Sequence, residues 1–158
     1  MQRLVFAALT ICVGLTGCCG KNSLSGSVSQ VYTLDFQTVT GSFDGDPVNV
    51  LTIAYLKGAD ATTGYTMKVV VDLNGLTITP GVAIDLTQTS NGQQRGSFEQ
   101  ILSTNDVQLP FSTASLTLDE APVVGKELSG KFAATFTDPA GHAVQGNFDI
   151  AKLTAVSR

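Results

Sequence analysis

The sequence predicts an all-β protein, an antiparallel β-sandwich of about 8–10 short strands. Three observations predict this class. Apolar residues recur at every second position, which is the spacing of a strand with one buried face. Turn-forming pairs such as Asn-Gly and Asp-Pro separate these runs about every 8–12 residues. No window longer than about ten residues shows the apolar spacing of an amphipathic helix without a Gly or Pro inside it.

The alternating runs follow one another from Val28 onward. In the first of them, Tyr32, Leu34 and Phe36 are apolar and the residues between them are polar. Each run places its apolar side chains on one face of a strand. The predicted strands are 32–36, 51–55, 65–73, 76–79, 82–86, 98–102, 116–118, 128–136 and 144–150.

Turn residues stand between the runs. Asn74-Gly75 separates 69–73 from 76–79, and this pair favours a type I′ hairpin because both central positions need φ > 0. In Asp138-Pro139-Ala140-Gly141, the proline suits position i+1 of a type I turn. The other predicted turns are 90–92, 105–106 and 119–122.

A closed up-and-down β-barrel is the alternative arrangement of such strands. The barrels of lipid-anchored lipocalins carry a Gly-x-Trp motif near their first strand, and this chain contains no Trp. The sandwich is therefore favoured. Gly-x-Phe occurs four times, which predicts at each place a glycine that turns the chain, followed by an inward-facing phenylalanine. The four glycines are Gly41, Gly96, Gly130 and Gly146.

Size and charge exclude some classes of function. A chain of 158 residues allows one domain. Thirteen acidic residues outweigh nine Lys and Arg, and no basic cluster is present, so we expect no binding to nucleic acid.

The amino terminus has the order of a secretory signal. Met1-Gln2-Arg3 is a short basic start, and an almost unbroken apolar run follows over 4–15. As a helix, this run reaches only about 18 Å, well short of the hydrocarbon core of about 30 Å. A permanent transmembrane helix is therefore disfavoured.

Leu15-Thr16-Gly17-Cys18 resembles the lipobox of bacterial lipoproteins, in which an aliphatic residue, a small residue, and Gly or Ala precede an obligatory Cys. The resemblance implies cleavage between Gly17 and Cys18, and acylation of Cys18. It also implies a location in the bacterial cell envelope, held by the lipid anchor. The residue after the lipidated Cys is Cys19 rather than the Asp that retains such proteins at the inner membrane, which favours the outer membrane.

Three segments follow from this resemblance: a lipoprotein signal peptide (1–17), a lipidated flexible tether (18–27) and a single β domain (28–158). The small, polar, aperiodic composition of 20–27 is typical of a flexible linker. Once the signal is removed, eight basic and thirteen acidic residues remain, a net charge of −5. The stretch 116–150 also resembles the carboxyl-terminal part of uncharacterised β-rich bacterial lipoproteins.

No assembled catalytic set is visible, and we expect neither an enzyme nor a bound cofactor. His142 is the single His of the chain, and in a predicted turn it is interpreted as a solvated residue. No metal site is expected. The weak candidate is Asp44, Asp46 and Asn49, three oxygen side chains beside Gly45, and a turn is the preferred interpretation.

Two hypotheses of function follow. The first is a non-catalytic envelope protein with a structural or protein-interaction role, which binds another envelope protein through a sheet face or edge. The second is a binding module for a small molecule or glycan, which requires exposed aromatic residues on a concave face. The supply of aromatic residues is small, so the first is favoured. The burial of Tyr32, Tyr55 and Tyr65 discriminates between them.

Overall fold

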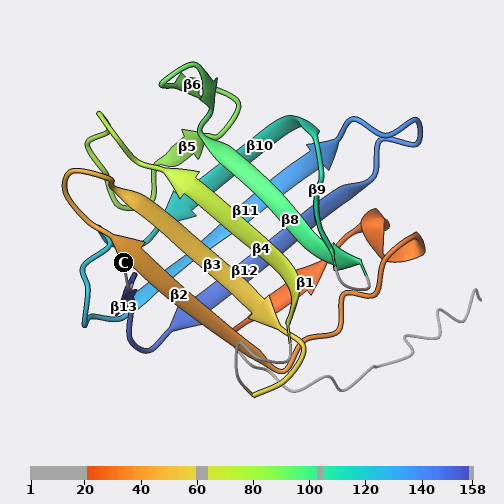
Figure 1. Ribbon diagram of the computed structural model, residues 1–158, viewed down its shortest axis with the longest axis horizontal. Coiled ribbons are helices and arrows are strands. Elements are labelled where there is room, and N and C mark those ends of the chain that lie inside the picture. Colours follow the sequence, from red (N-terminus) through yellow and green to blue (C-terminus); the bar gives the residue numbers. More distant parts are fainter. Residues whose placement is uncertain (1–20, 60–63, 103–104, 157–158) are drawn as a thin grey trace, which may run out of the picture.

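The computed structural model describes residues 21–59, 64–102 and 105–156. In these ranges the chain forms β-strands and one short 3-10 helix, η1 (Ser27–Gln30), and no α-helix (Figure 1). The strands are β1 (Ser23–Ser25), β2 (Thr38–Asp44), β3 (Val50–Leu56), β4 (Tyr65–Asp72), β5 (Ala83–Asp85), β6 (Thr89–Ser90), β7 (Gln93–Gln94), β8 (Gly96–Leu102), β9 (Asn105–Gln108), β10 (Phe111–Leu118), β11 (Leu128–Phe136), β12 (Ala143–Ile150) and β13 (Thr154–Ala155).

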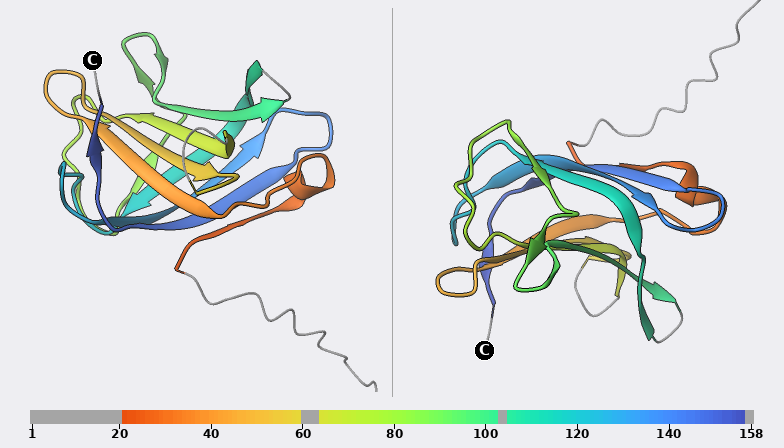
Figure 2. Two further views of the ribbon diagram at one scale, coloured as in Figure 1. Left: turned by 60° about the horizontal axis from the view of Figure 1, so that its bottom comes forward. Right: turned by 90° about the horizontal axis from the view of Figure 1, so that it is seen from above.

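Two sheets lie face to face and form a sandwich (Figure 2). One has five strands in the order β1-β12-β11-β10-β5, and all its neighbours are antiparallel. The other has six strands in the order β13-β2-β3-β4-β8-β9, with one parallel pair, β13 and β2, at its edge. Each sheet ends in a short edge strand on both sides, and neither sheet closes on itself. The predicted sandwich is therefore confirmed.

Alternate residues of the long strands fill the space between the sheets. In β3, Leu51, Ile53 and Tyr55 are completely buried. Phe98 of β8 reaches the opposite sheet, where its ring lies 5.3 to 5.9 Å from three other phenylalanine rings. Those three are Phe111, Phe132 and Phe136.

Two Gly-x-Phe motifs pair with each other in the five-stranded sheet. In the register of β11 and β12, Gly130 lies opposite Phe148, and Phe132 lies opposite Gly146. A Cβ atom added to Gly146 would lie 2.6 Å from the ring of Phe132. Both phenylalanines are in the core, as predicted. The prediction that these glycines turn the chain is wrong, because both lie inside strands and make room for the ring of the neighbouring motif.

The prediction of a strand at 32–36 is also wrong. After η1 the chain runs along the sandwich without joining a sheet, although Tyr32, Leu34 and Phe36 pack against the core as the alternation indicates. Alternating hydrophobicity reports which side chains are buried. It does not report whether a neighbouring strand is available for backbone pairing.

Asn74-Gly75 forms a turn, as predicted, but the two segments beside it do not pair as a hairpin. The N–H of Leu76 donates to the carbonyl of Leu73 at 3.1 Å, but only Gly75 has a positive φ, of 71°. This pattern matches a type II turn rather than type I′. The residues after it form no strand, because β4 already has β3 and β8 as its two neighbours.

The type I′ geometry is found at a second Asn-Gly pair. Asn91 and Gly92 connect β6 to β7, with φ values of 52° and 80°. A two-residue connection with both φ values positive is the preferred hairpin turn. The same dipeptide therefore forms two different turns in this chain.

Part of the expected tether is folded. Ser23–Ser25 forms β1, which pairs with β12, whereas the sequence shows no strand periodicity there. Just before it, the Lys21 ammonium lies 2.7 Å from the carboxylate of Asp149, and the backbone N–H of Asp149 donates to the side chain of Asn22. The chain is thus attached to the edge of β12 from Lys21 onward.

Candidate functional site

An open cavity of about 530 Å³ lies at one end of the sandwich. Three segments that are far apart in the sequence surround it: η1, the connection from β9 to β10, and the turn from β11 to β12 (Figure 1). Its volume and its mainly apolar walls are typical of sites for small molecules. The lining residues are Val28, Val31, Tyr32, Val107, Gln108, Leu109, Pro110, Phe136, Thr137, Asp138, Pro139, Ala140 and His142.

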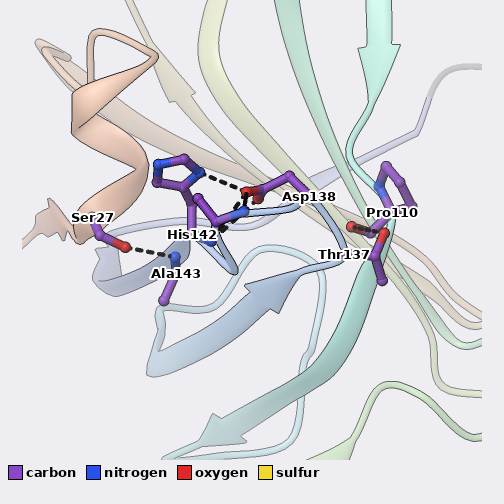
Figure 3. Close-up of polar contacts among 7 residues, drawn as sticks. Ser27, Pro110, Thr137, Asp138, His142 and Ala143 are labelled. Carbon is purple, nitrogen blue, oxygen red and sulfur yellow. Dashed lines mark hydrogen bonds and ion pairs between the residues drawn. The ribbon is translucent and has the colours of Figure 1, made fainter.

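The turn from β11 to β12 supplies the polar part of this cavity. The N–H of Gly141 donates to the carbonyl of Asp138 at 2.9 Å, which closes the predicted turn with Pro139 at its second position. The carboxylate of Asp138 accepts a hydrogen bond from the N–H of Ala140 at 3.0 Å, and its Oδ1 lies 2.7 Å from Nδ1 of His142 (Figure 3).

The hydrogen bonds around Asp138 favour its ionised form. Burial opposes ionisation, but the hydrogen bonds from the imidazole of His142 and from the backbone N–H groups of Ala140 and His142 outweigh it. They hold the pKa of the Asp138 carboxyl below its usual value. An ionised carboxylate only accepts hydrogen bonds, so Nδ1 of His142 carries the shared proton, and Nε2 is directed away from Asp138 (Figure 3).

His142 is less exposed than the sequence predicts. Only 14% of its side-chain surface is accessible, because the ring packs between the turn and η1 (Figure 3). A hydrogen bond of 2.9 Å from the N–H of Ala143 to the hydroxyl of Ser27 joins η1 to the start of β12. The signal that could have found the pair is the Asp at the first position of an Asp-Pro turn, whose carboxylate reaches the groups that follow it.

The three tyrosines differ in burial. Tyr55 is completely buried, and its hydroxyl donates to the carbonyl of Asn147 at 2.7 Å, from one sheet to the other. Tyr65 is half-buried, and its hydroxyl lies 3.4 Å from a carboxylate oxygen of Glu99. Tyr32 is half-buried and lines the cavity. One tyrosine of the three is therefore placed where a ligand could meet it.

The loop that holds the weak metal candidate has another role. The side-chain amide of Asn49 donates to Asn74 at 3.2 Å, and its backbone N–H donates to the carbonyl of Gly45. Across the described ranges, no group of three or more His, Cys, Asp or Glu side chains could hold a metal ion. Asp44 is the last residue of β2, and Asp46 lies in the loop at 45–49, which contains the cis peptide bond before Pro47.

A polar network that the sequence did not predict joins this loop to the end of β4. The N–H of Asn74 donates to the carboxylate of Asp72 at 2.8 Å, and the guanidinium of Arg95 donates to the backbone carbonyls of both residues. Burial opposes ionisation of Asp72. Hydrogen bonds from Ser90 and Asn74, together with the charge of Arg95, outweigh burial and lower the pKa of Asp72.

This network predicts a dependence of stability on pH. Because the pKa of Asp72 is lower in the folded state, its ionised form stabilises the fold above the unfolded pKa, about 3.9. That contribution is lost as the pH falls through the folded pKa. We expect Asp72→Asn to be less stable than the parent at pH 7, with the difference shrinking below about pH 4. Urea unfolding at a series of pH values measures it, and a difference that is constant with pH would contradict the assignment.

The residues of the predicted anchor, Gly17 and Cys18, lie outside the described residues, as do Cys12 and Cys19. In the part of the chain that the structure covers, no helix is long and apolar enough to cross a membrane. No protein-family model, curated protein or solved structure matches this chain.

Proposed function

We propose that this chain is a lipoprotein of a bacterial cell envelope, held at the outer membrane by acyl groups on Cys18. We further propose that its β-sandwich binds another envelope protein and has no catalytic role. The anchor part of the proposal rests on the signal-like segment 1–17 and on the lipobox pattern that ends it.

One observation carries the proposal furthest, the attachment of Lys21 and Asn22 to Asp149 on β12. Only Cys19 and Gly20 separate Cys18 from the attached chain, a span of about 10 Å at most. Two or more acyl chains on one residue anchor a protein stably. With so short a connection, a protein anchored at Cys18 keeps its domain against the membrane surface, where other envelope proteins lie.

The partly unpaired edge of β10 favours the proposal that another protein binds to this chain. β5 pairs with β10 only at 115–117, and in the described ranges no strand lies beside 111–113 on that side. Backbone groups on an open edge can pair with an added strand from another protein. Ser112 and Thr113 in this stretch are exposed, which leaves room for such a strand.

Removal of the acylated cysteine tests the proposal in cells. We expect the parent chain to incorporate labelled palmitate, to sediment with membranes, and to cross-link to one reproducible envelope protein from a photo-reactive residue at position 112. Cys18→Ala should abolish the labelling and reduce the cross-linked product about tenfold, because two-dimensional confinement is lost.

Two matched controls sharpen this experiment. Cys19→Ala should keep both the label and the cross-linked product. A photo-reactive residue at Thr40, which is exposed on the other sheet, should give no such product. Labelling that persists in Cys18→Ala contradicts the anchor, whereas equal cross-linking from positions 40 and 112 contradicts the β10 edge as the binding surface.

A further inference from the structure

The cavity at the end of the sandwich has a distinctive balance of charge. Among the described residues that line the cavity, Asp138 carries the one carboxylate, and none is Lys or Arg. The Oδ1 atom of Asp138 is occupied by the ring of His142 and the N–H of Ala140, whereas Oδ2 has only a longer contact of 3.2 Å with the N–H of His142. A carboxylate oxygen accepts more than one hydrogen bond, so Oδ2 can accept another donor.

A second acceptor lies on β8, the strand next to the lining strand β9. Gln100 of β8 is paired with the lining residue Val107 of β9, and only 4% of its surface is exposed. Its Oε1 atom is buried and has no hydrogen-bond partner among the described residues. One strand away from the lining residue Val107, a buried acceptor therefore lacks a donor.

Most of the exposed surface of the lining is apolar. Val28, Leu109 and Phe136 are buried in its floor, while Val31 is 56% exposed at its opening. A ligand with an apolar body would cover Val31 and extend the core, which is favourable because apolar surface leaves water. Half-buried Tyr32 adds an aromatic ring, a group that attracts cations.

We propose that this cavity binds a small cationic amphiphile, with an apolar body against Val31 and Phe136 and a protonated amine donating to Asp138. An anionic amphiphile such as a fatty acid is disfavoured, because its head group would meet the carboxylate of Asp138 in a lining that contains no Lys or Arg. This site requires neither the lipid anchor nor the β10 edge, so its failure leaves the proposed function standing, and the reverse is also true.

The test compares two probes that have six carbon atoms each and head groups of opposite charge. Isotope-labelled full-length chain in phosphatidylcholine nanodiscs is titrated at pH 8 with hexylammonium or with hexanoate, and amide shifts are followed by NMR. Empty nanodiscs serve as the blank. We expect saturable shifts at Val107, Thr137 and His142 with hexylammonium, none at Asn91, and binding of hexanoate about tenfold weaker or less.

Three variants separate the contributions to binding. Asp138→Asn keeps an acceptor for the turn but removes the charge, and it should bring the two probes within about threefold of each other. Val31→Gln should weaken both probes equally. Val82→Gln, at a site of nearly equal exposure (55%) away from the cavity, should change neither.

The opposite results overturn the proposal. The parent chain would bind hexanoate and hexylammonium equally, or its amide shifts would not saturate. Alternatively, Asp138→Asn would keep the parent's preference for hexylammonium, or Val31→Gln and Val82→Gln would weaken binding equally. Each would mean that the cavity does not select a cation by its carboxylate.

Discussion

Gly130→Ala should lower the free energy of unfolding by about 3 kcal/mol, a large loss for the addition of a single methyl group. A Cβ atom at this position would lie 2.3 Å from the backbone oxygen of Thr117 and 2.7 Å from the ring of Phe148. The ring can rotate, but the carbonyl belongs to the neighbouring strand β10 and moves only if the sheet moves. The midpoint of urea unfolding, followed by circular dichroism, measures the loss.

Gly45→Ala is the matched control. A Cβ atom there would meet only the ring of Phe43, at an ordinary contact distance of 3.7 Å, and we expect a change within about 0.5 kcal/mol. The double variant Gly130→Ala/Phe148→Leu tests which obstacle dominates. If the carbonyl of Thr117 dominates, the smaller side chain recovers little of the loss. Full recovery, or equal midpoints for Gly130→Ala and Gly45→Ala, would contradict the argument.

Tyr55→Phe should cost about 2 kcal/mol, although it removes a single oxygen atom. The hydroxyl of Tyr55 joins β3 to the backbone carbonyl of Asn147 in β12, and the substitution removes this hydrogen bond between the two sheets. The ring would keep its edge contacts with Phe36 and Phe132, at 4.9 and 5.9 Å between centroids. The loss therefore isolates the hydrogen bond from the packing.

Alkaline unfolding offers a second measurement of the same bond. Burial raises the pKa of Tyr55 above its usual value, so the protonated hydroxyl stabilises the fold fully below the unfolded pKa of about 10. This contribution is lost as the pH rises through the folded pKa. We expect the gap between the parent and Tyr55→Phe to narrow above pH 10. Tyr65→Phe removes a longer contact, made by a half-buried residue, and should lower the free energy of unfolding by less than half as much as Tyr55→Phe. Equal losses of stability in the two variants would refute the role of Tyr55.

The sequence was most informative where burial and backbone pairing coincide. The runs 51–55, 128–136 and 144–150 lie in β3, β11 and β12, because their apolar faces form the core and each strand has neighbours on both sides. The runs 32–36 and 76–79 have the same alternation, but neither is paired with a strand. Availability of an edge depends on the whole topology, which a local pattern does not contain.

The candidate site was harder to predict for a related reason. Its walls come from η1, β9 and the turn after β11, and only the fold brings these segments together. The Asp-Pro turn itself was predicted correctly, yet the burial of His142 depends on η1, which Ser27 holds against Ala143 from more than a hundred residues away. The anchor motif is local, so the sequence alone was enough to propose it.

If Cys18 carries the proposed lipid anchor, the position of β1 affects two properties, the length of the connection to the membrane and the protection of a sheet edge. With β1 in place, β12 is covered, and the chain from Lys21 back to Cys18 is long enough to span about 10 Å at most. Release of β1 and of Lys21 from Asp149 would extend that reach to about 30 Å and would uncover the edge of β12 in the same event.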